Sequence, residues 1–335
     1  MSILITGGAG FIGSFTAKRC AEAGREPVVL DNLVTGRIER ARWGQFHQCD
    51  VRDVPAVRAI IRSHAVTAVV HLAASAHVGE SIDNPAQYYS NNVAGTLALL
   101  DAMHAENVRH IVFASSCSVY GNAGSLSLKE DDDPRPVSPY GESKLIAERA
   151  LAWYVRAYGF RSISLRYFNV AGADSESDLG EDLQTSLRII PRAIQAARAD
   201  HGSFDIFGTD FDTIDGTAVR DYIHVRDVAE ANLRAIEYLE SGRPSTVMNL
   251  GTGTGLSVRQ IVDEVGKVLG RPVPVRECPR RPGDVPCAVA DPSRAAAVLG
   301  WQPLRSALSD IVGSALARQH TARGTDVPSD KSDIS

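Results

Sequence analysis

The sequence lacks the features that mark membrane, fibrous and nucleic-acid-binding proteins. Its 335 residues contain no apolar run near the roughly 18 residues that a membrane span needs. Lys and Arg total 35 against 40 Asp and Glu, so no basic excess points to nucleic acid as a partner. With 28 Gly and 16 Pro, the composition is neither collagen-like nor disordered. These absences leave a globular protein of roughly two domains.

Signals for export and for metal binding are also missing. The start, from Met1 to Ile5, has no basic region of a signal peptide, so we expect a cytoplasmic protein. No C-x-x-C pair is present, so we expect reduced thiols and no metal site. The five cysteines are Cys20, Cys49, Cys117, Cys278 and Cys287. His71, His77 and His224 have no partners at metal-ligand spacing and are interpreted as structural.

Short β-branched runs alternate with segments of helical length in the first half of the chain. The runs lie at residues 3–5, 28–30, 69–72, 111–113 and 163–165. This alternation predicts a parallel sheet covered by helices on both faces, a doubly wound α/β fold of the Rossmann type. We expect this domain to span residues 1–168.

The pattern changes after about Asn169. An acidic loop at residues 174–182 precedes a predicted helix over residues 189–199, and shorter elements rich in Gly and Pro follow. We predict a smaller C-terminal substrate-binding lobe over residues 169–320, with a return to the sheet near residues 247–250. Residues 321–335 have no periodicity and are predicted to form a disordered tail.

A glycine-rich segment follows the first predicted strand directly. Its glycines are Gly7, Gly8, Gly10 and Gly13. The spacing suits a tight turn whose backbone N–H groups approach a pyrophosphate at a helix N-terminus. The second predicted strand ends in Asp31, where a carboxylate can bind ribose hydroxyls and repel a 2′-phosphate. The pattern favours NAD over NADP, although Arg37 nearby could accept a 2′-phosphate.

A Tyr-x-x-x-Lys pair opens a predicted helix in a chain that has only five lysines. Tyr140 and Lys144 are four residues apart, so their side chains share one helix face. A phenol with a reference pKa near 10 becomes a usable base when an ammonium and a nicotinium stabilise its phenolate. Upstream, a predicted strand ends at Ser115 and Ser116, where a hydroxyl can relay the proton of a reacting oxygen. The three residue types predict proton transfer beside a nicotinamide.

Several motifs, in matching order, resemble the extended short-chain dehydrogenase/reductase family and, more narrowly, its UDP-glucose 4-epimerases. They are T-G-G-A-G-F-I-G at 6–13, V-G-E-S at 78–81, Y-Y-S-N-N at 88–92, S-S-C-S-V-Y-G at 115–121, Y-G-E-S-K at 140–144, R-Y-F-N at 166–169, G-T-A-V-R-D-Y-I-H-V at 216–225 and R-R-P-G-D at 280–284. The resemblance extends to about Pro303 and covers nearly the whole chain.

The resemblance implies an NAD-dependent UDP-hexose 4-epimerase that interconverts UDP-glucose and UDP-galactose through a 4-keto intermediate. In the family, NAD⁺ takes hydride from C4 while a tyrosine, matched by Tyr140, accepts the 4-hydroxyl proton. Ser116 matches the serine that bridges the two oxygens. Lys144 matches the lysine that holds the nicotinamide ribose and lowers the tyrosine pKa. A homodimer through a four-helix bundle is also implied, with the helices after Pro85 and Tyr140 as candidates.

The implied cofactor contacts lie mainly around the ends of the predicted strands. They are Gly7, Gly10, Phe11, Ile12, Gly13, Asp31, Asn32, Thr35, Gly36, Asp50, Val51, Leu72, Ala73, Ala74, Asn91, Tyr140, Lys144 and Phe168. Asp50 is expected to close the third strand and bind the adenine amino group. A helix cap is its alternative role, and Asp53 is an equally good candidate.

The implied substrate contacts come mostly from the second half of the chain. They are Ser116, Tyr140, Asn169, Arg188, Phe207, Arg220, Tyr222, Arg281, Asp284 and Ala288. Arg220 and Arg281 can clamp a diphosphate, Asp284 can accept ribose hydroxyls, and aromatic rings can border the uracil. Arg188 stands where family members commonly have Asn or His, and either strengthens phosphate binding or points outward.

Two other positions depart from the family. Ala76 replaces a commonly found lysine that contacts the cofactor, so weaker NAD retention is expected. Ala288 stands where members restricted to unacetylated sugars have a bulky aromatic residue, which predicts acceptance of UDP-N-acetylhexosamines as well.

Other functions on the same fold were weighed against this one. A nucleotide-sugar 4,6-dehydratase needs an Asp-Glu pair where this chain has Cys117 and Ser118. A UDP-glucuronate or UDP-pentose 4-epimerase remains an alternative that the sequence leaves open. A non-catalytic dinucleotide sensor is a remote alternative, because sensors normally lose the Tyr or the Lys.

Overall fold

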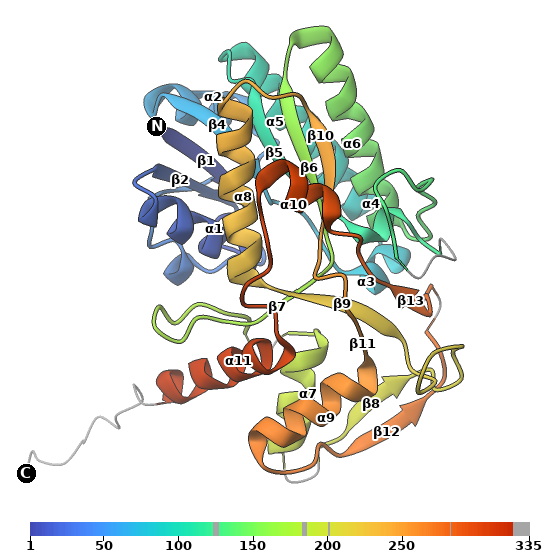
Figure 1. The fold of residues 1–335 in the computed structure, drawn as a ribbon. Helices are drawn as coiled ribbons and strands as arrows, with labels where there is room; N and C mark the ends of the chain where they lie inside the picture. The colour runs from blue at the N-terminus through green and yellow to red at the C-terminus, as the bar shows by residue number, and fades with distance from the viewer. Residues whose placement is uncertain (123–126, 183–185, 200–201, 282, 324–335) are drawn as a thin grey trace, which may run out of the picture.

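The structure is a computed structural model of the chain. It describes residues 1–122, 127–182, 186–199, 202–281 and 283–323, with side chains to residue 317. Figure 1 shows a sheet flanked by helices and, below it, a smaller group of helices and short strands.

A seven-stranded sheet forms the larger part of the fold. Its strands are β1 (Ser2–Thr6), β2 (Glu26–Asp31), β3 (Gln45–Gln48), β4 (Val66–His71), β5 (His110–Ser116), β6 (Arg161–Tyr167) and β10 (Thr246–Leu250). Their order is β10-β6-β5-β4-β1-β2-β3, and all neighbours are parallel. This confirms the predicted doubly wound fold. Chain order reverses between β1 and β4, and ligands of such folds bind beyond the carboxyl ends of the strands there.

Helices cover both faces of this sheet. Helices α1 (Phe11–Glu22) and α8 (Val225–Glu240) pack on one face, and α2 (Val54–Ser63), α5 (Gly95–Ala105) and α6 (Pro139–Tyr158) on the other. Ile3 and Ile5 face the first group whereas Leu4 faces the second, and all three are fully buried. The strands therefore need apolar residues at every position, which explains their unbroken apolar runs.

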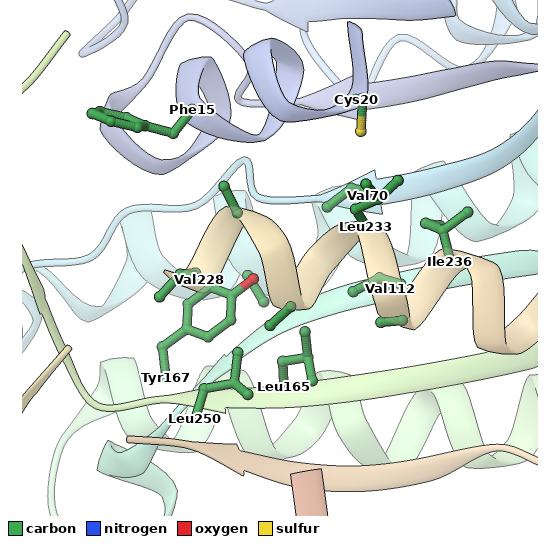
Figure 2. Packing of buried hydrophobic residues seen from close by; sticks show 14 of the residues in the cluster. Phe15, Cys20, Val70, Val112, Leu165, Tyr167, Val228, Leu233, Ile236 and Leu250 are labelled. Carbon is green, nitrogen blue, oxygen red and sulfur yellow. The ribbon is translucent and has the colours of Figure 1, made fainter. Parts of the chain in front are cut away.

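Figure 2 shows the core on the α8 side. Val228, Leu233 and Ile236 of α8 lie in one buried cluster with Val112 and Leu165 of the sheet. Both α8 and β10 come from the second half of the chain. The chain returns to the sheet at residues 246–250, where the sequence predicted a return near 247–250, and α8 packs on the same sheet.

The smaller part contains two short sheets. One joins β7 (Asn169–Ala171), β9 (Val219–His224), β11 (Gly255–Ser257) and β13 (Cys287–Ala288), and the other joins β8 (Phe204–Phe207) and β12 (Val275–Cys278). Helices α7 (Ile189–Arg198), α9 (Val258–Leu269) and α11 (Leu308–Arg323) share their own buried cluster. The predicted helix over 189–199 is thus α7, with Ala199 as its C-cap residue.

Short elements complete the fold. They are η1 (Ile38–Arg40), α3 (Val78–Asp83), α4 (Pro85–Tyr88), the π-helical turn η2 (Tyr89–Ala94), η3 (Cys117–Val119) and α10 (Ser293–Leu299). Helix α11 continues through residues 321–323, the first part of the predicted tail, and residues 324–335 lie outside the described residues. Among the described residues, no helix combines the length and the apolar character needed to cross a membrane.

Candidate active site

The glycine-rich turn between β1 and α1 is packed too closely for side chains. Gly7 has a φ of +68°, and a Cβ there would lie 2.7 Å from the backbone nitrogen of Ala73. A Cβ on Gly13 would lie 2.1 Å from the carbonyl oxygen of Gly7. Gly10 is the N-cap of α1, which has neither a side-chain cap nor an acidic residue in its first turn. The first N–H groups of α1, from Phe11 onward, are therefore available to an anion.

Asp31 lies beside this turn at the carboxyl end of β2. Its carboxylate accepts hydrogen bonds from the backbone nitrogens of Ala9, at 3.0 Å, and Leu33, at 2.9 Å. Burial raises the pKa of the Asp31 carboxyl. Gly36 lies so close that a Cβ would come within 2.6 Å of the Asp31 carboxylate. The guanidinium of Arg37 pairs with Asp182 of the acidic loop.

Asn32 and Asp50 meet beyond the ends of the neighbouring strands β2 and β3. The Asn32 amide donates to Asp50 Oδ2 at 3.2 Å, and the Arg52 guanidinium donates to both carboxylate oxygens, at 2.7 Å to Oδ2 and 2.8 Å to Oδ1. Hydrogen bonds from Arg52 lower the pKa of Asp50. Asp53 is the residue that caps α2, accepting from the backbone nitrogen of Ala56 at 3.1 Å. Asp50 lies two residues beyond the end of β3 and keeps its place beside Asn32.

The end of β4 and the π-helical turn η2 bring the next group together. The backbone nitrogen of Leu72 donates to the Thr6 carbonyl oxygen at 3.1 Å, which fixes Leu72 and Ala73 against the glycine turn. Asn91 donates to Ser75 Oγ at 3.3 Å. Among the remaining cofactor candidates, Ile12 and Ala74 are half-buried, Thr35 is exposed, and Val51 and Phe168 are buried.

Asn92 is a positioning residue that the sequence analysis missed. Its buried amide accepts from Ser75 N at 2.8 Å and donates to Ser75 O and to Ser143 Oγ, both at 3.0 Å. Ser143 in turn donates to the carbonyl oxygen of Tyr140 at 2.7 Å. This chain of hydrogen bonds ties the start of α6 to the loop after β4. Its only sequence signal is the second Asn of Y-Y-S-N-N, and π-helical turns often mark functional sites.

Helix α6 presents Tyr140 and Lys144 to the carboxyl end of β5. Ser138 caps the helix, accepting from Gly141 N at 3.2 Å. The Lys144 ammonium donates to the carbonyl oxygen of Ala114 at 2.8 Å and lies 5.9 Å from the centre of the Tyr140 ring. Ser116, the last residue of β5, lies close enough to the Tyr140 hydroxyl to oppose the rise of its pKa. The three predicted catalytic side chains therefore lie together at this end of β5.

Burial controls the ionisation of this group. It raises the pKa of Tyr140, which the hydrogen bond to Ser116 and the charge of Arg188 oppose. It lowers the pKa of Lys144 to about 7, against the charge of Glu148. The amine and the phenol are thus both shifted toward their uncharged forms, which a bound anion or cation can reverse.

The histidines have structural contacts, as interpreted from the sequence. His71 is buried between the hydroxyls of Thr6, at 2.7 Å, and Thr96, at 3.0 Å. Burial, with the nearby charge of Lys144, lowers the pKa of His71 to about 3. His224 lies 3.2 Å from Ser314 Oγ. No cluster of three or more potential metal ligands occurs within the described part of the chain, and all five cysteines are free thiols.

The short sheet of β7, β9 and β13 brings a second set of predicted residues together. Asn169 of β7 is opposite Tyr222 of β9, and Arg220 of β9 is opposite Ala288 of β13. Burial raises the pKa of Tyr222 and the charge of Arg220 opposes the rise. Ala288 shares a buried cluster with Phe168 and with Leu145, the residue after Lys144. The specificity candidate thus lies next to the catalytic helix.

Three predicted residues form a separate group at the edge of the smaller part. The Arg281 guanidinium lies 4.8 Å over the ring of Phe207 in β8 and 3.0 Å from the carboxylate of Asp284. An arginine, an aromatic ring and a carboxylate on one surface can bind phosphate, a base and ribose hydroxyls.

Arg188 lies between the two parts of the molecule. It is the N-cap residue of α7, and its guanidinium lies 5.2 Å over the ring of Phe11 at the start of α1. It donates to the Val170 carbonyl oxygen at 3.0 Å and lies 3.4 Å from Glu181. Its side chain is therefore directed toward the start of α1. Its contact with a diphosphate stays a prediction.

Comparisons with known proteins agree with this geometry. The model of the NAD dependent epimerase/dehydratase family matches residues 3–251. The UDP-glucose 4-epimerase of Rhizobium meliloti is 45% identical over 302 residues, which cover 90% of this chain and 92% of that protein. The UDP-glucose 4-epimerase of Rhizobium leguminosarum bv. trifolii is also 45% identical, over 314 residues, which cover 94% of this chain and 96% of that protein.

Two solved structures share the fold closely. The crystal structure of UDP-glucose 4-epimerase from Brucella ovis in complex with NAD has a TM-score of 0.91 and 46% identity, covering 96% of this chain and 98% of its own. That of UDP-glucose 4-epimerase from Bifidobacterium longum in complex with NAD⁺ and UDP has a TM-score of 0.90 and 34% identity, covering 96% and 99%.

Proposed function

The chain belongs to the NAD-dependent epimerase/dehydratase family, and from this premise we propose that it is an NAD-dependent UDP-hexose 4-epimerase. Its reaction is the interconversion of UDP-glucose and UDP-galactose. The observation that carries the proposal is the meeting of Ser116, Tyr140 and Lys144 at the carboxyl end of β5, beside the glycine-rich turn.

The residues present fit NAD. The uncapped start of α1 suits its diphosphate, Asp31 suits the adenosine ribose, and Asn32 with Asp50 lies where the adenine would follow. Bound there, NAD⁺ would supply a reversible hydride acceptor for C4 of the hexose. C4 inverts without net oxidation because the 4-keto sugar turns its opposite face to the site before the hydride returns. Ala76 offers no lysine contact, so we expect weaker cofactor retention than in relatives that have one.

Three side chains take part in the proton transfer. Tyr140 accepts the proton of the 4-hydroxyl and later returns it, because its phenolic oxygen is the base that the buried site offers at that position. Ser116 hydrogen-bonds both the tyrosine and the sugar oxygen. The ammonium of Lys144 stabilises the phenolate and binds the nicotinamide ribose.

The UDP moiety binds across the two parts of the protein. Arg220, Arg281 and Arg188 neutralise the diphosphate, and charge-assisted bonds of this kind are stronger than neutral ones. Asp284 accepts hydrogen bonds from the uridine ribose hydroxyls, and Phe207 borders the uracil. Asn169 and Tyr222 complete the wall beside the sugar.

The proposal is tested by proton NMR of the purified protein with UDP-galactose and no added NAD. Conversion of the anomeric and H4 signals to those of UDP-glucose is the expected result, and it also requires that NAD co-purifies. Absence of conversion even with added NAD⁺ would contradict the hexose assignment. UDP-glucuronate and UDP-pentoses would then be tested in the same way.

The small side chain of Ala288 leaves room beside the sugar C2 substituent. We therefore expect the protein to turn over UDP-N-acetylglucosamine and UDP-N-acetylgalactosamine as well. Ala288→Tyr is expected to lower the activity on the acetylated sugars by about ten-fold or more, because its ring fills that space, and to leave the activity on UDP-glucose unchanged. The kcat/KM ratio for the two sugar classes measures this, and an unchanged ratio would contradict the assignment.

The proposal includes a cytoplasmic homodimer. Free thiols at all five cysteines agree with a reducing compartment. Apolar side chains are exposed on α5 and α6, where the dimer is expected, notably Leu97, Tyr158 and Trp153, which is 63% exposed. Light scattering is expected to give twice the 35.9 kDa chain mass, and Trp153→Glu to lower it toward one chain. A wild-type mass of one chain would exclude the dimer.

A further inference from the structure

We propose that Glu148 is a positioning residue for the reaction: its buried carboxylate keeps the amine of Lys144 protonated and fixes the strand end that carries Ser116. This inference rests on the proposed function, because it concerns the residues to which that function assigns proton transfer.

Tyr140, Lys144 and Glu148 occupy successive turns of one face of α6. All of them pack against the carboxyl end of β5. The Lys144 ammonium bonds the carbonyl oxygen of Ala114, and the next residue, Ser115, donates its hydroxyl to the Glu148 carboxylate at 2.5 Å. Lys144 is 4% and Glu148 8% exposed, so solvent screens their charges little.

Arg166 of β6 holds Glu148 in place. Its guanidinium makes two parallel bonds to the carboxylate, at 3.0 Å from Nε and 2.7 Å from Nη2. The guanidinium also lies 4.8 Å over the ring of Tyr120 and donates to the Glu130 carbonyl oxygen at 3.3 Å. A carboxylate that accepts three such hydrogen bonds is fixed in position.

Stability alone does not explain this buried pair. A well-packed apolar pair of similar volume is often as stable as a buried ion pair, or more stable, because burying two charges costs solvation energy. An apolar pair cannot supply a fixed negative charge one helical turn from Lys144. Burial lowers the pKa of Lys144, and Glu148 is the charge that opposes this loss of the ammonium.

The groups around Lys144 and Tyr140 leave these two as the ones that titrate. His71 faces Lys144 from β4, and burial lowers its pKa to about 3, so it stays neutral. Cys117 of η3 faces Tyr140, and burial raises its pKa to about 11. The tyrosines Tyr88 of α4 and Tyr167 of β6 also face Tyr140, and burial raises both of their pKa values. Arg188 faces Tyr140 as a permanent cation.

The sign of the effect follows from these charges. Without the Glu148 charge the Lys144 amine loses its proton at lower pH. The charge that can stabilise a phenolate on Tyr140 is then lost at lower pH, so the alkaline limb of activity moves to lower pH.

The test compares Glu148→Gln with wild type, with Glu148→Asp, which keeps the charge, and with Glu142→Gln, the same change six residues earlier on α6. The first readout is kcat/KM for UDP-galactose from about pH 6 to about pH 10, because this ratio reports groups of the free enzyme. The second is the titration of the Lys144 amine, followed by NMR of the ¹³Cε signals of the five lysines, with Lys144→Arg in each background identifying the Lys144 signal. The second readout requires no turnover.

We expect Glu148→Gln to move both the alkaline limb and the Lys144 titration down by about one pH unit. Glu148→Asp is expected to restore both, and Glu142→Gln to leave both as in wild type. An unchanged alkaline limb and an unchanged Lys144 titration in folded Glu148→Gln would overturn the inference. If that variant does not fold, the double variant Glu148→Gln, Arg166→Gln replaces it, because it leaves no buried charge unpaired, and the same shifts are expected.

The two readouts separate the inference from the proposed function. An inactive wild-type protein would refute the function, and the Lys144 titration would still decide whether Glu148 controls the charge of the amine. An active wild-type protein with no shift in either readout would refute the inference alone.

Discussion

Tyr140→Phe is expected to lower kcat for UDP-galactose by about 10³-fold or more. The substitution removes only the phenolic oxygen, so the sugar hydroxyl loses its proton acceptor while the ring keeps its packing against Tyr88, 6.3 Å away. Binding of NAD and UDP is expected to change little, because most of their contacts lie on other elements. The measurement is single-turnover kinetics together with a titration of UDP affinity.

Tyr158→Phe is the matched control for this result. It removes a phenolic oxygen from the same helix, at its far end, where the Tyr158 ring packs 4.4 Å from His104. We expect wild-type turnover in this control. A Tyr140→Phe protein that retains kcat within about ten-fold of wild type would show that another group is the base.

Arg166→Met is expected to lower the free energy of unfolding by about 3–5 kcal/mol. The guanidinium is 4% exposed, and its removal leaves the buried carboxylate of Glu148 with the Ser115 hydroxyl as its remaining donor in the described network. Leaving one buried charge without its partner lowers the free energy of unfolding more than removing both charges of the pair does. Urea unfolding followed by circular dichroism measures the change.

Arg135→Met is the matched control. Arg135 pairs with Asp133 at 3.0 Å, but these side chains are 77% and 72% exposed, so little change in stability is expected. The double variant Arg166→Met, Glu148→Gln is expected to lose less free energy of unfolding than the two single variants lose in sum, because both charges are removed together. A single Arg166→Met variant as stable as Arg135→Met would contradict the account of the buried pair.

The sequence predicted well those features that neighbouring residues determine. The apolar runs of β1 and β2 follow from burial on both sheet faces, and the glycine spacing follows from a turn that has no room for Cβ atoms. The Tyr140 and Lys144 pairing needs only the helical repeat, which a cap at Ser138 and a proline at the first helical position start. The end of α7 was predicted to within one residue for the same reason.

Other features depend on residues that only the folded chain brings together. Asn92 reaches Ser143 across 51 positions, and Arg188 reaches the ring of Phe11 from the other part of the molecule. A sequence motif cannot show either contact, because the side chains involved are ordinary polar residues until the chain places them. The helices expected after Pro85 are also interrupted by the π-helical turn that carries Asn91 and Asn92.

The sequence by itself therefore determined the fold class and the tight glycine turn, and it predicted the candidate catalytic residue types, because each depends on spacing along one segment. Only the tertiary structure decided how these residues ionise and which residues of the smaller part lie near the candidate site. The charge on Lys144 depends on burial beneath β5 and on Glu148, which Arg166 of a different strand holds in place. Desolvation and charge pairing act over distances in space, and parallel strands joined by helices bring together residues that are far apart in the chain.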